Sequence, residues 1–180
     1  MDDYIKTKLS KNDKDILKEI YEELENITIP TTYQKCGGQG HQIRTGTIKQ
    51  KQARQTSFGK IRFQGKIQNS KYTKKYPYIF PLFKEFINSH YPDFKFKTVY
   101  VNKNTVCKLH TDSRNVGESL LVGFGPYTGG QTVLEIENSN GKKINKKFHI
   151  KTNSLIFNGS EIPHKSEPFK GTRYSLVFFK

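Results

Sequence analysis

Two histidines and an aspartate in the last part of the chain are side chains that bind metal ions. His110 and Asp112 are separated by a single threonine, and His164 follows much later, directly after a proline. On a strand, side chains at positions i and i+2 project to the same face, so His110 and Asp112 can reach one ion. Two imidazoles and one carboxylate suit iron(II) and leave coordination positions open for other ligands. The pattern predicts a metal centre, with His164 as the third ligand, for oxidation by activated O₂.

Arg173 and Ser175 supply the second half of such a site. A 2-oxo acid can take two open positions on the iron, and a second carboxylate at its far end needs a fixed cation. Arginine suits this role because its planar guanidinium binds a carboxylate through two parallel bonds. Ser175 lies at i+2 from Arg173 and shares its face. Each residue alone is explained equally well as an ordinary surface position, so the prediction depends on their joint occurrence.

The elements that must position these residues are short strands behind a helical front. At 180 residues, the chain fits one domain with a core rich in its 13 Phe and 10 Tyr. Apolar spacing predicts helices from Asn12 or Asp13 to Asn26 and over Pro77 to His90, and short strands within Thr56 to Ile67. From Phe94 onward, turn signals separate further expected strands, which are Phe96–Val101, Val106–Asp112, Ser119–Phe124, Gln131–Glu137, Lys146–Ile150, Ser154–Phe157 and Thr172–Phe179.

This order of elements predicts the fold class. Many short strands with glycine-rich turns, after helices at the front, indicate a mainly β protein with flanking helices (α+β) whose core is a double-sheet jelly roll. We expect a single domain over residues 1–180. Residues 1–93 would hold the helices and a basic substrate-binding segment, and residues 94–180 the β core. No internal repeat or interdomain linker is visible.

The net charge of +15 is not spread evenly along the chain. Between Asn26 and Lys84 there is no Asp or Glu. A basic segment without acids favours a polyanionic partner, most often nucleic acid. A lysine-rich composition alone would explain many of the cations, but it does not explain the missing acids. The cations of this segment are Lys35, Arg44, Lys49, Lys51, Arg54, Lys60, Arg62, Lys66, Lys71, Lys74, Lys75 and Lys84.

Other features bear on location. No apolar run is long enough to span a bilayer, and the first residues lack the order of a secretory signal. We therefore expect an intracellular protein, cytoplasmic or nuclear, without membrane contact. Cys36 and Cys107 are far apart and form no CxxC motif, which predicts reduced thiols.

The motifs His110-Thr111-Asp112, His164 and Arg173-Tyr174-Ser175 resemble those of the iron(II)/2-oxoglutarate-dependent dioxygenases. The resemblance covers roughly Thr98 to Lys180. It implies a double-stranded β-helix (cupin-like) fold and the cofactors Fe(II), 2-oxoglutarate and O₂, with ascorbate as a candidate stimulant. It implies that His110, Asp112 and His164 ligate the metal and that Arg173 and Ser175 hold 2-oxoglutarate. Asn102 or Tyr100 would also contact the co-substrate.

The segment from Asn102 to Leu134 resembles one group within these dioxygenases more than the others. Asn115-Val116-Gly117-Glu118-Ser119, followed by Gly125-Pro126-Tyr127-Thr128-Gly129-Gly130, is similar to the TET/JBP group, which oxidises the 5-methyl group of pyrimidines in nucleic acid. The AlkB-like demethylases are a neighbouring group, but the second arginine that follows their Arg-x-Ser is absent here. The cysteine-rich region of TET enzymes is absent as well. A prolyl- or lysyl-type protein hydroxylase with a basic groove for an acidic peptide remains the rival interpretation.

The expected partner is nucleic acid, DNA rather than RNA, and the expected state is a monomer. Phe58 and Phe63 alternate with cations, so each can stack on a base or fill the core. A third alternative is a basic binding module without activity, which the intact metal triad disfavours. The candidate substrate-binding residues are Arg114, Asn115, Arg44, Arg54, Arg62 and Phe58.

Overall fold

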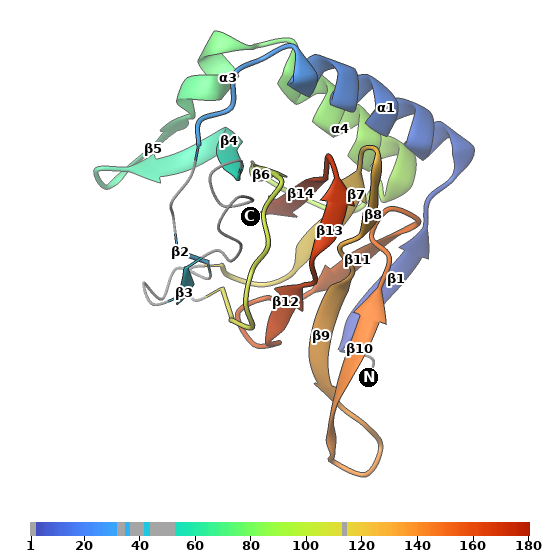
Figure 1. Ribbon diagram of the computed structural model, residues 1–180. Coiled ribbons are helices and arrows are strands. Elements are labelled where there is room, and N and C mark those ends of the chain that lie inside the picture. Colours follow the sequence, from blue (N-terminus) through green and yellow to red (C-terminus); the bar gives the residue numbers. More distant parts are fainter. Residues whose placement is uncertain (1–2, 32–34, 37–41, 44–52, 113–114) are drawn as a thin grey trace.

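Two antiparallel sheets form the framework of the protein (Figure 1). The computed structural model describes residues 3–31, 35–36, 42–43, 53–112 and 115–180. In the seven-stranded sheet the order is β1 (Tyr4–Lys8), β11 (Asn153–Phe157), β7 (Ser119–Phe124), β14 (Tyr174–Phe179), β6 (Thr98–Lys103), β4 (Arg54–Phe63) and β5 (Lys66–Asn69). The three-stranded sheet contains β10 (Lys143–Phe148), β9 (Thr132–Glu137) and β12 (His164–Ser166).

Two pairs of short strands complete the β-structure. β13 (Phe169–Gly171) pairs with β8 (Tyr127–Gly129), and β2 (Lys35–Cys36) pairs with β3 (Gln42–Ile43).

Helices α1 (Lys11–Glu25) and α4 (Ile79–His90) cover one face of the large sheet, and α3 (Lys71–Lys75) lies near β4 (Figure 1). Ser10 begins α1 with a capping box, in which its hydroxyl accepts from the Asp13 N–H and the Asp13 carboxylate accepts from the Ser10 N–H. The apolar faces of both helices pack on the sheet, because its strands present alternate side chains to them. The largest side chains of this core are Phe58, Phe83, Phe86, Tyr174 and Phe178.

The opposite face of the large sheet is partly covered by the small sheet. A second apolar cluster joins β11 to the small sheet, so the two sheets enclose an interior. Along β14, Leu176 and Phe178 point toward the helices, and Ser175 and Val177 therefore point into this interior. The mainly β, jelly-roll architecture predicted from the sequence is confirmed. Members of the second cluster are Leu134, Phe148, Ile150, Leu155 and Phe157.

The expected strand over Val106–Asp112 is wrong. That segment lies outside any strand, and only His110 within it forms an isolated bridge, to His164. The sequence interpretation also missed β1, β8, β12, β13 and α3, which are three to five residues long. Elements this short carry too few apolar positions to show a period. Among the described residues, no helix is long and apolar enough to cross a membrane.

Candidate metal centre

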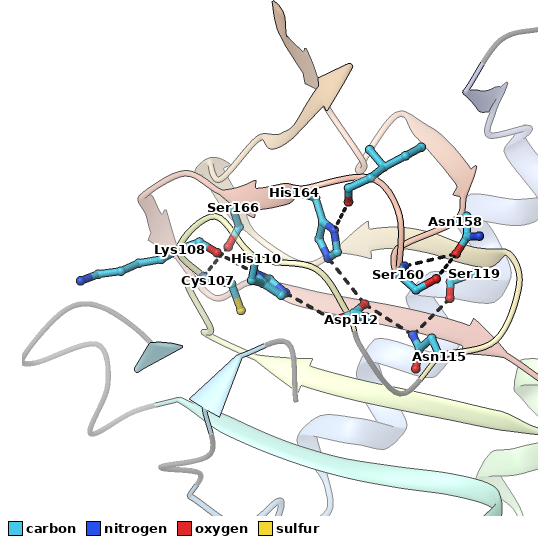
Figure 2. Close-up of polar contacts among 11 residues, drawn as sticks. Cys107, Lys108, His110, Asp112, Asn115, Ser119, Asn158, Ser160, His164 and Ser166 are labelled. Carbon is cyan, nitrogen blue, oxygen red and sulfur yellow. Dashed lines mark hydrogen bonds and ion pairs between the residues drawn. The ribbon is translucent and has the colours of Figure 1, made fainter. Parts of the chain in front are cut away.

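Three metal-binding side chains converge at the end of the interior where β12 begins (Figure 2). His110 Nε2 lies 3.4 Å from Asp112 Oδ1, and His164 Nε2 lies 3.5 Å from Asp112 Oδ2. Candidate ligand atoms of all three residues lie within 4.8 Å of one another. Two ligands each about 2.1 Å from an octahedral ion lie about 3 Å apart. The two distances between the aspartate and the histidines are close to this value.

The backbone fixes the relative positions of these three residues. His110 and His164 exchange both backbone hydrogen bonds, at 3.0 and 2.9 Å, and the Asp112 N–H donates to the Gly159 carbonyl at 2.8 Å. A Cβ at Gly159 would lie 3.0 Å from Asp112 Oδ2. Glycine at this position therefore leaves room for the carboxylate beside the histidines.

Each imidazole is oriented by its second nitrogen (Figure 2). His110 Nδ1 lies 2.6 Å from the Lys108 carbonyl oxygen, and His164 Nδ1 lies 2.9 Å from the Ile162 carbonyl oxygen. A carbonyl oxygen only accepts, so in both rings Nδ1 carries a hydrogen. Nε2 faces the Asp112 carboxylate, to which it donates when protonated, and it offers its lone pair to a metal ion when it is not protonated. Such outer hydrogen bonds are typical of metal-ligating histidines.

The aspartate of the cluster is ionised and open on one side. Burial opposes ionisation, but hydrogen bonds and charge from His110 and His164 hold the pKa of Asp112 well below its usual range. The Asp112 side chain keeps 26% of its surface exposed, whereas the His110 side chain keeps 7%. The site is therefore accessible from the carboxylate side. Asn115 Nδ2 lies 3.4 Å from both Asp112 Oδ2 and Ser119 Oγ, so its amide contacts the aspartate.

Arg173 lies deep in the same interior, with 3% of its surface exposed. Its Nε donates to the Gly130 carbonyl at 3.2 Å, and its guanidinium carbon lies 5.6 Å from the centre of the Tyr127 ring. Burial lowers the pKa of Arg173, while Tyr127 and Cys107 oppose this shift. Among the described residues, Arg173 forms no ion pair. An arginine remains charged even when buried, so this cation requires an anion that the described chain does not supply.

Residues that the sequence interpretation did not single out shape the Arg173 environment. Asn104 Oδ1 accepts from the Arg173 N–H at 2.9 Å, and the Asn104 N–H donates to the Arg173 carbonyl at 2.7 Å. A Cβ at Gly130 would lie 2.9 Å from Arg173 Nε. Tyr127 is 7% exposed, and burial raises the pKa of its hydroxyl although Arg173 opposes the shift. The only signal for these roles was the Pro-Tyr-Thr-Gly-Gly run itself.

The other expected co-substrate residues lie on the same interior face. Ser175 is 5% exposed and pairs across the strands with Asn102, while Tyr100 pairs with Val177, two residues further along. Asn102 therefore lies closer to Ser175 than Tyr100 does. The Tyr100 ring packs edge-on against Phe179, with 4.7 Å between ring centres.

The structure separates the candidate substrate-binding residues. Phe58 was a candidate either for stacking on a base or for the core. It is fully buried against Phe83 on the helix side, so the base-contact alternative is wrong. Arg54 also lies on the helix side, because its Nη1 donates to the Ile29 carbonyl at 2.6 Å. It therefore does not line the metal side of the sheet. Arg62 is exposed on the β4–β5 hairpin. Arg44, Arg114 and His41 are outside the described residues.

No protein-family model and no curated protein matches the chain by sequence. Solved structures match it by fold. NgTET1 in complex with 5mC DNA has a TM-score of 0.62 at 14% identity, over 98% of this chain and 71% of that chain. A 2OG-Fe(II) oxygenase-family oxidoreductase from Burkholderia pseudomallei has a TM-score of 0.60 at 13% identity, over 98% and 84%. The fold is that of the 2OG-Fe(II) oxygenases.

A Pseudomonas putida prolyl-4-hydroxylase has the same oxygenase fold, with a TM-score of 0.56 at 12% identity, over 99% of this chain and 92% of that chain. One structure thus holds DNA and another is a protein hydroxylase. The shared oxygenase fold does not select a substrate.

Proposed function

We propose that the protein is an Fe(II)/2-oxoglutarate-dependent dioxygenase that hydroxylates a C–H bond. The observation that carries this proposal is the pairing of two features in one interior. A His110–Asp112–His164 cluster has the donor set for iron(II), and a buried Arg173 has no acidic partner among the described residues. A dicarboxylate that chelates the iron and reaches Arg173 satisfies both features. Iron(II), 2-oxoglutarate and O₂ supply the hydroxylation, with succinate and CO₂ as products.

In this proposal each residue has a defined task. His110, Asp112 and His164 hold the metal through two Nε2 atoms and one carboxylate. Arg173 binds the distal carboxylate of 2-oxoglutarate through paired N–H groups, and Ser175 donates a further hydrogen bond. Asn102, which lies opposite Ser175, is the first candidate for a further contact to the co-substrate, and Tyr100 is the second.

The surroundings of Arg173 keep water away from the co-substrate. Val106, Tyr127 and Phe169 form a small buried apolar cluster, and the Tyr127 ring stacks near the guanidinium. In such surroundings a charge-assisted hydrogen bond is stronger than in water. In this proposal the distal carboxylate lies among buried side chains at Arg173, whereas the iron end faces the substrate at the exposed edge of Asp112.

For the substrate, we propose the 5-methyl group of a pyrimidine, 5-methylcytosine or thymine, in nucleic acid and in DNA rather than RNA. The TET/JBP-like run from Asn115 to Gly130 and the segment without acids before Lys84 support this choice. A base inside a duplex must be flipped out to reach the iron, and phosphate contacts must offset a cost of a few kcal/mol. Cations from the basic segment supply such contacts.

Mass spectrometry of nucleosides tests this function. Purified protein with Fe(II), 2-oxoglutarate and ascorbate is incubated with DNA and RNA, each unmodified or carrying 5-methylcytosine. We expect 5-hydroxymethylated pyrimidines together with succinate, and neither product with Asp112→Ala. Loss of N-methyl groups from alkylated DNA instead would indicate an AlkB-like demethylase. Hydroxylation in a panel of prolyl and lysyl peptides, without change in nucleic acid, would indicate a protein hydroxylase.

A further inference from the structure

The β4–β5 hairpin extends beyond the body of the large sheet (Figure 1). It carries exposed apolar side chains. Phe63 is 54% exposed and Ile67 is 66% exposed. Cross-strand pairing puts Phe63 opposite Lys66 and Ile67 opposite Arg62, so the two apolar side chains lie on opposite faces of the ribbon. A two-stranded ribbon with an apolar group on each face and no core beneath it is a docking element rather than a packing element.

Residues with positive φ lie at the base and at the turn of the hairpin. Gly59 has a φ of +88°, and a Cβ there would overlap the Lys97 carbonyl oxygen, so only glycine permits the bend at which β4 leaves β6. Gln64 and Gly65 both have positive φ, at 48° and 76°. Two such residues form the tight turn that favours a twisted hairpin.

The charge of the hairpin identifies its partner. Lys60, Arg62 and Lys66 are exposed, and none of them forms an ion pair with another described residue. No acid occurs anywhere in the hairpin or in α3 behind it. By contrast, Lys143 and Lys147 of the other long hairpin pair with Glu135 and Glu167. Each face of the ribbon thus carries an apolar side chain beside an unpaired cation, Phe63 with Lys66 and Ile67 with Arg62. This arrangement fits phosphates beside a base, which is the chemistry of a nucleic-acid strand.

We propose that the β4–β5 hairpin binds nucleic acid at a distance from the reacting base, with Phe63 stacking on a base and Arg62 and Lys66 contacting phosphates. This inference rests on the proposed function and names the remote part of the same substrate site. β4 starts beside Asn102 on the co-substrate side and ends at Phe63. Phe63 lies eight residues beyond Gln55, the partner of Asn102, along β4. At about 3.3 Å per residue, the distance between Gln55 and Phe63 is at most about 26 Å, which corresponds to roughly eight nucleotides of a stacked strand.

The span predicts a dependence on substrate length. A strand of about 20 nucleotides reaches both the iron and the hairpin, whereas a strand of about six nucleotides reaches only one of them. Hairpin variants are therefore expected to weaken binding of the long strand and to leave binding of the short strand centred on the modified base unchanged.

Fluorescence anisotropy of metal-free protein with labelled 20-mer and 6-mer DNA, single- and double-stranded, at several salt concentrations tests the inference. Phe63→Ala is expected to weaken 20-mer binding about tenfold without changing the salt slope. The double variant Arg62→Gln/Lys66→Gln is expected to lower the slope of log K against log salt by about 1.8 for the duplex. Lys142→Gln and Ile144→Ala, on the β9–β10 hairpin, are the matched controls and are expected to bind like the wild type.

Wild-type 20-mer affinity in both hairpin variants would overturn the inference, as would equal competition by polyglutamate, which would indicate an acidic protein partner. The experiments distinguish a failure of the hairpin role from a failure of the proposed function. Oxidised nucleosides from a protein whose hairpin variants bind normally would leave the function intact and remove the hairpin role. Hairpin-dependent binding without any oxidised nucleoside would remove the function and retain the hairpin role.

Discussion

Asp13 and Arg173 are two buried charged residues on opposite sides of the large sheet, and they differ in their partners. Asp13, on the helix side, accepts hydrogen bonds from the Ser10 N–H at 2.8 Å and the Ser89 hydroxyl at 2.7 Å, and its Oδ2 lies 2.8 Å from His90 Nδ1. The Arg173 side chain donates a hydrogen bond to the Gly130 carbonyl and contacts Tyr127, and it has no acidic partner among the described residues. A buried charge with full internal satisfaction is structural, whereas one without an opposite charge indicates a ligand.

The histidines on the two sides differ in the same way. His90 is a buried structural residue, and its Nε2 lies 2.6 Å from the Ser154 hydroxyl. That Asp-His-Ser chain is completely closed, since Ser154 has no exposed surface. His110 and His164 instead direct Nε2 toward a carboxylate that is partly open to solvent.

The largest predicted difference concerns the two aspartates. Asp112→Ala should reduce succinate formation by at least about 10³-fold, because the metal loses a ligand, and should change the free energy of unfolding by less than about 1 kcal/mol. Asp13→Ala should cost about 3–5 kcal/mol of unfolding free energy, because it leaves His90 without its partner. Urea unfolding and succinate assays measure both. Full turnover in Asp112→Ala would remove it from the metal site.

The two aromatic residues of the β4 strand give the next largest contrast. Phe58→Ala should lower the free energy of unfolding by about 3–5 kcal/mol, because it opens a cavity against Phe83 and Tyr72. Phe63→Ala should change it by no more than about 0.5 kcal/mol, because the side chain is mostly exposed. Urea denaturation of the metal-free variants is the measurement, and equal destabilisation would show that Phe63 belongs to the core.

Arg173→Met tests the difference between a buried charge with internal partners, such as Asp13, and a buried charge without an acidic partner. We expect the KM for 2-oxoglutarate to rise about 100-fold, since a bidentate charged contact is lost. The metal-free variant should be as stable as the wild type or more stable, because an unpaired buried charge is replaced by an apolar side chain of similar length. Steady-state kinetics and thermal unfolding test both parts. A loss of stability as large as that of Asp13→Ala would make Arg173 a structural residue.

The smallest predicted effect is on pH dependence. Burial opposes ionisation of Asp13, but hydrogen bonds from Ser10, Ser89 and His90 lower its pKa in the folded protein. The ionised carboxylate therefore stabilises the fold above its unfolded pKa of about 3.9, and this contribution is lost as the pH falls below that value. Asp13→Asn should be less stable at pH 6 and should lose less stability between pH 5 and 2.5. The stabilities are measured by urea unfolding at each pH. If the free energy of unfolding changed equally with pH in the wild type and in Asp13→Asn, the stabilising role of the Asp13 carboxylate would be contradicted.

The sequence predicted the metal cluster better than the element that carries it. His110, Asp112 and His164 do converge, although no strand runs through Val106–Asp112. Residue type and spacing are enough to suggest a ligand set, because few other roles require two histidines and a carboxylate together. The alignment of His110 with His164 comes from a single long-range bridge, which no local pattern encodes.

The different environments of Phe58 and Phe63 could not be predicted from the sequence. Both lie in one alternating run, and alternation alone gave each the same choice between core and base contact. The bend at Gly59 and the turn at Gln64 divide that run into a buried part and a projecting part. Asn104 was missed for a related reason, since its contact with Arg173 depends on a positive φ at Asn104 and on strand register.

The central claim is that one interior holds a metal at His110, Asp112 and His164 and a dicarboxylate at Arg173. A crystal structure of the protein with Mn(II) and N-oxalylglycine tests it most directly. We expect one metal ion bound by the two Nε2 atoms and the Asp112 carboxylate, with the distal carboxylate of the analogue paired to the Arg173 guanidinium. Metal bound elsewhere, or an analogue whose distal carboxylate does not contact Arg173, would contradict the account.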